Sequence, residues 1–525
     1  MSSPAAVVAR LGVRQVRRGT LIVAGVSGFF LAAAIAAYDQ LSGAASSFDE
    51  LAANPGMRAL LGVPWDLTTS GGFVAWRAQA FIALIVAIWA ALAATRVFRG
   101  EEERGHWDLL LAAPLTRARG VSVHLALFVA AGLVTALVVL ASLLASGEAW
   151  PGSLLFGGGV GLVLVLFAGV GAVTSQLVPQ RRLAAGLAGI TVGAFFLLRM
   201  AADVTDTYGW LRWLTPFGWL ENLRAFSGDD PAALLLLGGA AAVTFVVTVV
   251  MAQRRDLGAG VVQVTDEAKP RLRLLGSADG FAVRRRSREL IGWGSALLVL
   301  AFVYGGLGGS VTDLLDSNPQ LQQFLDQLGM TDLFSVTGYI ALMASLLSVV
   351  IAVYPISVVH AEQEDEEDGR LDLAQSGAVT RSRWLGALVW SAAAAMAALA
   401  LLISAGLWLG GAASGAGLSA ADAFGATVAA LPVPLLVLGI VVLLHGVRPA
   451  WAVPTATAVA VGGYLVELFG PAFDWPNWVM NLSPYHHLAM VPVEPVAWPA
   501  TAVLLGLAVG CGALGFVGYH RRDLV

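Results

Sequence analysis

Long apolar runs separated by short charged stretches follow one another along the whole chain. A helix needs about 20 mostly apolar residues to cross a bilayer. The weakest run is the fifth, where only 16 uncharged residues separate Arg182 from Arg199. The pattern predicts an all-α polytopic membrane protein with about twelve spans, at residues 20–38, 73–95, 120–145, 153–176, 183–200, 232–251, 290–309, 335–359, 384–409, 422–444, 450–468 and 498–518.

Composition supports this class and excludes others. Apolar residues make up 58% of the 525 residues and charged residues 13%, about half of the roughly 25% that is usual in soluble domains. A soluble fold could not cover so much apolar surface, so a soluble enzyme and a disordered chain are excluded. Cys511 is the single cysteine, which excludes a disulfide or multi-cysteine metal framework.

Basic residues give the orientation. An even number of spans places both termini on one side, and with the N-terminus inside, 26 of the 31 lysines and arginines fall in inner segments. The positive-inside rule then predicts cytoplasmic N- and C-termini, in the plasma membrane. In residues 1–18, arginines lie between apolar positions, which predicts an amphipathic helix on the cytoplasmic surface.

Internal similarity suggests a duplicated chain. Residues 101–119 and 365–383, offset by 264, share a glycine, an Asp-Leu pair and a Thr-Arg-x-Arg motif, and each opens with three acids. Composition bias explains matched leucines but not matched charges and prolines. Two shorter motifs also repeat: Leu-Thr-Pro-Phe at 214–217 with Leu-Ser-Pro-Tyr at 482–485, and Arg-Arg-Asp-Leu at 254–257 with the same letters at 521–524.

The similarity predicts two six-span halves of parallel topology. The first is residues 1–251, including the N-terminal interfacial helix, and the second is residues 290–525. Residues 252–289 are predicted to be a basic cytoplasmic linker. Its arginines at 284, 285, 286 and 288 contact lipid head groups or simply flank the seventh span, which we favour.

The most specific pattern follows the second span of each half. Gly105 permits a sharp turn after an acidic run, and Pro114 stops the next helix. We predict a short charged elbow that can receive a push from a soluble partner, with a solvated loop as the alternative. The second acidic run begins like a calcium loop, but Gln375 stands where a bidentate carboxylate is required, so no metal site is expected.

These elbows resemble those of ABC-2-type permeases, which have a type V exporter-like fold. The duplicated twelve-span chain is similar to the actinobacterial polyketide-antibiotic exporter permeases of the tetronasin type. The resemblance implies export of lipophilic compounds such as antibiotics or drugs, driven by two copies of a separate cytoplasmic ABC ATPase. ATP and Mg would be bound by that ATPase, and this chain would hold no cofactor. The implied coupling residues are Glu101, Glu103, Gly105 and Asp108 in the first half and Asp365, Glu367, Gly369 and Asp372 in the second.

Outer segments 201–230 and 469–497 are rich in tryptophan, proline and other aromatic residues. The resemblance implies that they form short re-entrant helices that cap the pathway on the outer side. The alternative is an interfacial aromatic belt. The candidate outer-gate residues are Trp213, Pro216, Phe217, Trp475, Pro484 and Tyr485.

Catalytic motifs are missing. The single lysine, Lys269, lies in Ala-Lys-Pro, whereas a P-loop requires Gly-Lys-Ser/Thr, so we expect a non-catalytic permease subunit. Three charged residues lie near the outer ends of spans, namely Arg77, Arg199 and Glu467. Their side chains are expected to reach the interface between membrane and water. The lack of acids nearer mid-membrane argues against an ion-driven multidrug transporter. A membrane-embedded lipid-handling protein is the third possibility, and nucleic acid is not an expected partner.

Overall fold

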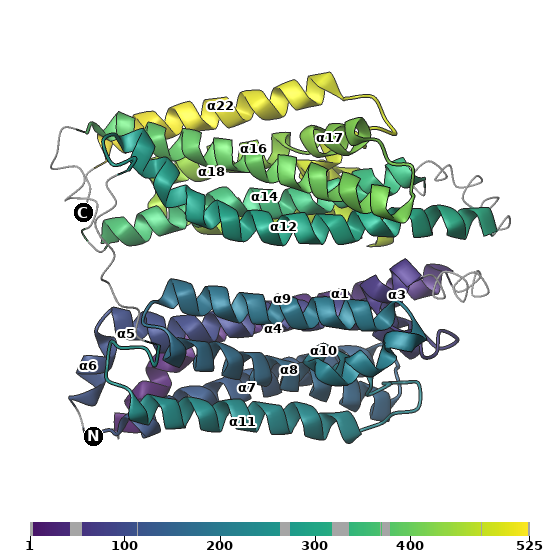
Figure 1. The fold of residues 1–525 in the computed structure, drawn as a ribbon, viewed down its shortest axis with the longest axis vertical. Coiled ribbons are helices and arrows are strands. Elements are labelled where there is room, and N and C mark those ends of the chain that lie inside the picture. Colours follow the sequence, from purple (N-terminus) through teal and green to yellow (C-terminus); the bar gives the residue numbers. More distant parts are fainter. Residues whose placement is uncertain are drawn as a thin grey trace. The chain divides into compact units, whose positions relative to one another are not determined.

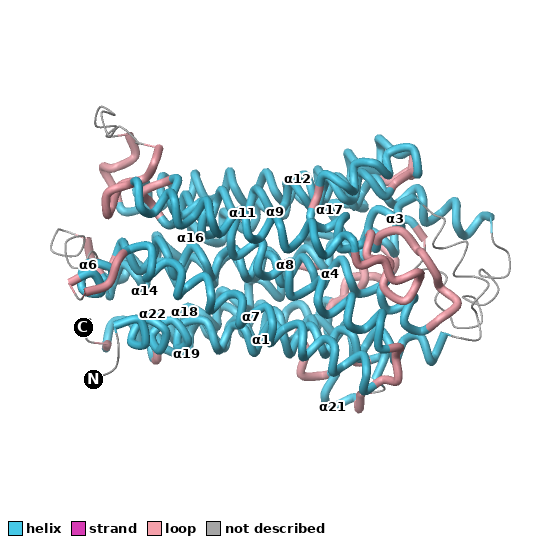
Figure 2. Tube along the Cα trace, turned by 90° about the horizontal axis from the view of Figure 1, so that it is seen from below, coloured by secondary structure: helices cyan, strands magenta, loops and turns pink. Residues whose placement is uncertain are grey.

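The chain forms two compact units, Met1–Ala268 and Lys269–Val525. The computed structural model describes residues 4–41, 55–112, 114–262, 273–317, 335–367, 369, 379–473 and 475–522. Helices and loops, with no strand, make up these described residues (Figures 1 and 2).

Six long helices build the first unit, and Figure 1 shows how they are arranged. They are α1 (Pro4–Leu41), α4 (Ser70–Thr95), α7 (Arg117–Ala145), α8 (Trp150–Leu177), α9 (Arg181–Asp203) and α11 (Ala232–Arg254). The π-helix η2 (Arg96–Gly100) and the short helices α5 (Glu101–Glu103) and α6 (His106–Leu111) lie at what we call the elbow end. The short helices α3 (Pro55–Leu61), η3 (Asp206–Leu214) and α10 (Pro216–Glu221) lie at the opposite end, the cap end.

The second unit also contains six long helical segments. Its long segments are α12 (Ala278–Ser317), α14 (Val336–Glu367), α16 (Arg381–Ser414), α17 (Ala420–Ala429) with α18 (Pro432–Val447), α19 (Pro449–Thr457) with η5 (Ala458–Gly462) and α20 (Gly463–Phe469), and α22 (Trp498–Arg521). Its short helices, between α20 and α22, are η6 (Pro471–Phe473), α21 (Asn477–Met480) and η7 (Tyr485–His487).

Twelve helices of the described residues are long and apolar enough to cross a membrane. Every predicted run overlaps one of them. The weakest run lies in α9, a helix of 23 residues. The prediction of an all-α polytopic membrane protein is therefore confirmed.

One predicted boundary is corrected by the structure. The N-terminal segment is no separate surface helix, because α1 continues unbroken to Leu41. Its buried positions Val8, Val16 and Thr20 continue the buried face of the first span, and a Cβ at Gly12 would come within 2.3 Å of Leu127 of α7. Within the predicted linker, residues 278–289 form the start of α12, and the apolar span of this helix begins at Glu289.

Glycines let the helices of the first unit pack closely around α8. A Cβ added at Gly171 would lie 2.2 Å from the backbone oxygen of Ala91 on α4. Gly161 of α8 and Gly132 of α7 face each other in the same way, each Cβ position lying 2.7 Å from the other residue's carbonyl oxygen. Because backbone atoms block these positions, a side chain there must separate the helices.

We expect Gly171→Ala to lower the free energy of unfolding of the first unit by about 1–3 kcal/mol, because the added methyl forces α8 away from α4. Gly158 is the matched control, since it lies on the same helix with nothing within 4 Å of its Cβ position. Gly158→Ala is expected to be neutral or slightly stabilising. Thermal unfolding of both purified variants in detergent tests this, and equal midpoints would contradict it.

Candidate functional site

The elbow of the first unit is a helix that turns sharply at a glycine. Helix α4 continues through η2 into α5, and Gly105 then adopts a left-handed conformation with φ +73° before α6 begins. Such a φ strains any residue with a side chain. Trp107 of α6 is buried and lies against α7, where a Cβ at Gly120 would be 3.0 Å from its ring. The turn and this ring fix α6 against the bundle.

A buried ion pair joins this elbow to the end of the sixth span. Glu102 of α5 pairs with Arg255, which follows α11, and both side chains are about 5% exposed. The backbone N–H of Gly258 donates to the same carboxylate at 2.7 Å. Arg99, completely buried, lies 3.3 Å from Glu102 and donates to the carbonyl oxygen of Ser175 at 2.8 Å. These contacts connect the elbow to α8 and to the end of α11.

The predicted coupling acids have different surroundings. Glu101 accepts from Arg104 at 3.3 Å and lies 2.7 Å from the imidazole of His106. Glu103 accepts the backbone N–H of Arg181 at 2.6 Å, so it caps the first turn of α9. Asp108 is exposed on α6. Glu101 and Glu103 therefore make contacts within the unit, whereas Asp108 lies exposed on α6.

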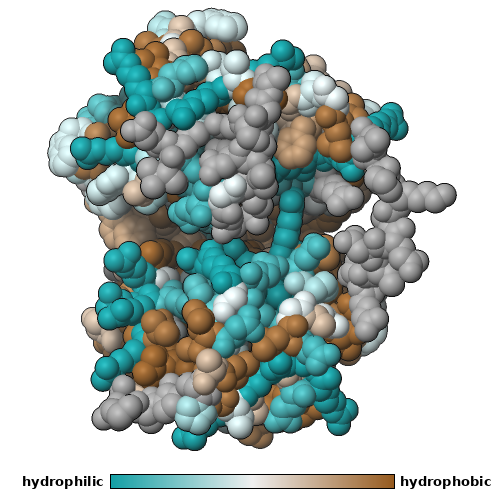
Figure 3. Space-filling model, turned by 90° about the vertical axis from the view of Figure 1, so that its left-hand side faces the viewer, coloured by the Kyte–Doolittle hydropathy of each residue, from teal (hydrophilic) through white to brown (hydrophobic). Residues whose placement is uncertain are grey.

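Two neighbouring residues of α6 are exposed at the elbow end. Leu109, next to Asp108, is 75% exposed although it is a leucine. Figure 3 shows hydrophobic residues among hydrophilic ones on the elbow end of the first unit, in the lower part of the view.

The second elbow places its acids in a similar way. Glu366 pairs with Arg522, the residue that follows α22. Asp365 pairs with Arg285 at 2.5 Å. Glu367 is the exposed last residue of α14, and Gly369 has φ +68°. Asp372, the remaining predicted coupling residue, lies outside the described residues.

Matched residues make matched contacts in the two units. Arg117 donates to the carbonyl oxygen of Arg255, and Arg381 donates to that of Arg522, at 2.8 Å. Each donor follows a threonine whose hydroxyl caps its helix. A duplicated chain would produce such pairs, and the duplication itself stays a prediction. The Arg-Arg-Asp-Leu motifs were recognised in the sequence as a repeat, but no role was predicted for their arginines. The position of both motifs directly after a sixth span was the signal that could have indicated such a role.

At the cap end of the first unit, Phe217 is the buried anchor of α10. Its ring centroid lies 5.2 Å from that of Phe167 and 5.4 Å from that of Phe196. The hydroxyl of Thr215 donates to the carbonyl oxygen of Phe195 at 2.8 Å, and Pro216 begins the helix. The residues of this predicted gate motif are therefore brought together against α8 and α9.

The second unit builds the same arrangement. Ser483 donates to the carbonyl oxygen of Gly463 at 2.9 Å, and Tyr485 packs edge-on against Tyr464 at 5.4 Å between ring centroids. The hydroxyl of Tyr485 donates to the carbonyl oxygen of Ala460 at 3.0 Å, and burial raises the pKa of this phenol above its ordinary value. Pro484 is also buried.

The two predicted gate tryptophans lie apart from these anchors. Trp213 is 52% exposed, and its backbone oxygen accepts a hydrogen bond from the indole N–H of Trp219 at 2.6 Å. Trp475 is half-buried and stacks on Phe473 with 6.1 Å between ring centroids.

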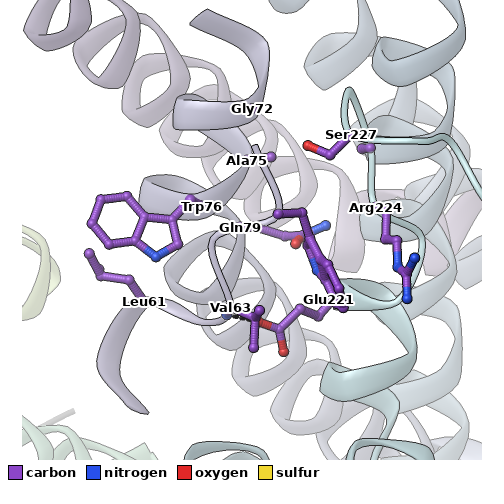
Figure 4. Close-up of a pocket in the computed structure, with 11 residues that line it drawn as sticks. Leu61, Val63, Gly72, Ala75, Trp76, Gln79, Glu221, Arg224 and Ser227 are labelled. Atoms are coloured by element: carbon purple, nitrogen blue, oxygen red, sulfur yellow. Dashed lines mark hydrogen bonds between the residues drawn. The ribbon is translucent and has the colours of Figure 1, made fainter. Parts of the chain in front are cut away.

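A small cavity of about 20 Å³ lies at the cap end of the first unit (Figure 4). Trp76, Gln79, Glu221, Arg224 and Ser227 are among the residues that line it. Glu221 accepts the backbone N–H of Val63 here, and the guanidinium of Arg224 stacks over Trp65 at 4.0 Å from the ring centroid.

One charged residue near this cavity, Arg199, is buried, which differs from the prediction made from the sequence. Arg199 was expected to reach the interface, but it is 2% exposed and donates to the carbonyl oxygen of Ala59 at 2.8 Å. Burial is possible because Asp203 lies 3.4 Å away. Nearby, the Arg58 guanidinium beside exposed Asp206, 2.5 Å away, holds the pKa of that carboxyl below its ordinary value.

The other two charged residues near the predicted outer span ends, Arg77 and Glu467, do reach the surface of their units. Glu467 pairs there with His486 at 3.1 Å. Among the described residues, no group of three histidine, cysteine or acidic side chains is placed to hold a metal ion.

Comparison with known proteins places the chain in a family. The family model described as multidrug efflux system permease Rv1217c, C-terminal domain, matches residues 1–252 and 275–520. A relative from Mycobacterium tuberculosis (strain ATCC 25618 / H37Rv), the multidrug efflux system permease protein Rv1217c, is 27% identical over 502 residues, which are 94% of this chain and 90% of the relative. The narrower likeness to tetronasin-type exporters stays a prediction. By these matches and its twelve apolar helices, the chain belongs to the Rv1217c family of multidrug efflux permeases and is a multi-pass membrane protein.

Proposed function

We propose that the chain is the permease subunit of an ATP-driven ABC exporter of lipophilic compounds. One chain supplies both transmembrane halves, its termini and elbows face the cytoplasm, and one copy of a separate ATPase docks at each elbow. Family membership supports drug export. The missing Gly-Lys-Ser/Thr motif supports a separate ATPase.

The observation that carries the proposal is the ion pair inside each elbow. Glu102 with Arg255 and Glu366 with Arg522 each connect the end of a second span to the end of a sixth span. In the first unit, Glu103 adds a connection to the start of α9. An ATPase that presses on α6 would therefore move several spans together instead of bending one loop. That is the property a coupling element needs to change access to a pathway between the spans.

The first test is biochemical. The chain purified alone should hydrolyse no ATP, and co-expression with its ATPase should give a complex of two ATPase copies per chain. Export should stop when ATP is depleted and continue when the proton gradient is collapsed. ATP hydrolysis by the pure chain, or export that follows the proton gradient alone, would contradict the proposal.

A point variant sharpens this test at one elbow. Leu109→Glu puts a charge on the exposed face of α6 without removing a contact that holds the unit together. We expect the number of co-purified ATPase copies to fall from two to one, because the second elbow is unchanged. Leu482→Glu is the control, since this leucine is 70% exposed and lies between α21 and η7, outside both elbows. Equal ATPase content in both variants would show that α6 is not the docking face.

A further inference from the structure

Four arginines lie exposed on α1 at the elbow end of the first unit, where this helix begins (Figure 1). Arg10, Arg14 and Arg17 are spaced by four and three residues, so they share one side of the helix. Arg18 borders this side. Buried Val16 marks the opposite side, which packs against the bundle. We call these four arginines the arginine face.

No acid on the surrounding helices neutralises this face. The first acid of the chain is Asp39, near the far end of α1. Neither α4 nor α7, the helices against which α1 packs, contains an aspartate or a glutamate. The three acids of α5 already have partners within the unit. Within the part of the chain that the structure describes, the four positive charges therefore lack a counterion.

The same side of α1 becomes apolar directly beyond the arginines. Leu21 and Ile22 follow Arg17 and Arg18 by one helical turn and are 63% and 65% exposed. Positive charge followed by exposed apolar side chains along one face matches an anionic phospholipid, whose phosphate lies next to its acyl chains. A soluble acidic partner would account for the arginines but not for these two side chains.

The neighbouring helix α4 shows at which level the arginine face lies. Gly19, the residue after Arg18, lies beside Trp89 of α4, since a Cβ there would come within 2.4 Å of the indole. Helix α4 runs towards the elbow end, and about one turn beyond Trp89 it still has an exposed apolar side chain, Leu92. The arginine face therefore lies at the boundary between acyl chains and phosphate groups, which long basic side chains can reach.

We propose that the arginine face binds the phosphate groups of anionic phospholipids in the leaflet at the elbow end, with Leu21 and Ile22 against their acyl chains. Guanidinium groups pair with phosphate through charge-assisted and often bidentate hydrogen bonds. Arginines on one side of a helix meet the same lipid surface, so their contributions add. Lipid binding of this kind depends neither on ATPase coupling nor on which side of the membrane the elbows face.

The arginines that precede the seventh span differ from this face. Arg285 pairs with Glu362 and, at 2.5 Å, with Asp365. Arg286 is buried and pairs with Glu289 at 3.3 Å. Both guanidinium groups are held within the second unit, so a basic stretch that looks similar in sequence is not exposed to lipid in the same way.

Native mass spectrometry of the full chain in detergent, with phosphatidylglycerol or phosphatidylcholine added, tests the lipid site. The wild type should retain phosphatidylglycerol in preference to phosphatidylcholine, and a higher salt concentration should weaken that preference. Replacing Arg10, Arg14 and Arg17 together by Gln should lower phosphatidylglycerol retention roughly tenfold or more, because each arginine near an anionic lipid adds to the attraction. Lys at the same three positions keeps the charge and should keep most of the binding.

The matched control removes three exposed arginines of the same end that lie on three different helices, by replacing Arg96, Arg119 and Arg254 together by Gln. It changes the net charge equally and should retain phosphatidylglycerol as the wild type does. Equal losses in the two variants, or a wild type without a preference for phosphatidylglycerol, would overturn the proposal.

Two further readouts keep the proposal testable. If the glutamine variant is not produced, the wild type decides, because phosphatidylglycerol retention that does not change with salt would overturn the proposal equally. If the variant loses co-purified ATPase and keeps its lipid, the face belongs to a protein contact and the lipid proposal is wrong. Lipid retention by the chain alone requires no ATPase, so failure here and failure of ATPase coupling are separate results.

Discussion

Arg255→Ala is expected to destabilise the first unit by about 3–5 kcal/mol, since it leaves Glu102 as a buried charge without its partner. The loss should be seen as a lower midpoint of thermal unfolding and as export that no longer follows ATP hydrolysis. Arg254→Ala is the matched control, because Arg254 is the exposed neighbour in the same motif. Its removal should change neither property.

The second unit offers the same comparison. Arg522→Ala should have a smaller effect, because Arg522 and Glu366 are 14% and 13% exposed and water can solvate the remaining carboxylate. Arg521→Ala is its exposed control. If Arg255→Ala and Arg254→Ala had equal midpoints, the ion pair would not hold the elbow, and the main support for a stiff coupling element would be lost.

Phe217→Ala is expected to cost about 3–5 kcal/mol of unfolding free energy, because it removes a ring that is 3% exposed and packed on two other phenylalanines. Trp213→Ala, on the neighbouring helix η3, should leave stability within about 0.5 kcal/mol, since its side chain is half exposed. Equal losses in thermal unfolding of the two variants would contradict this difference.

The same pair of variants distinguishes two interpretations of the cap end, an outer gate and an interfacial aromatic belt. If the cap end controls exit, Trp213→Ala should alter drug resistance, or ATP hydrolysis stimulated by substrate, in protein that is as stable as the wild type. If Trp213 only anchors the chain at the membrane interface, the specific activity of the protein that reaches the membrane should not change. Tyr485→Ala and Trp478→Ala, one buried and one 68% exposed, repeat the comparison in the second unit.

Hydropathy and charge along the chain were enough to predict the twelve spans, because crossing a bilayer imposes a local requirement on about 20 successive residues. The sharp turn at Gly105 was also local, since it depends on the conformational freedom of one residue. Repeated motifs, read without any structure, indicated which positions of the two halves should correspond.

Only the tertiary structure decided what the charged residues do. An acid run looks the same in sequence whether it meets solvent or an arginine about 150 residues away, so the inward position of Glu102 required the sixth span to be folded beside the elbow. Arg199 needed the packed α3 and Asp203 before burial became possible. The sequence by itself determined which segments are apolar enough to cross a membrane, because that property is additive along the chain. The pairing of buried charges is not additive, because each pair depends on where distant helices are placed.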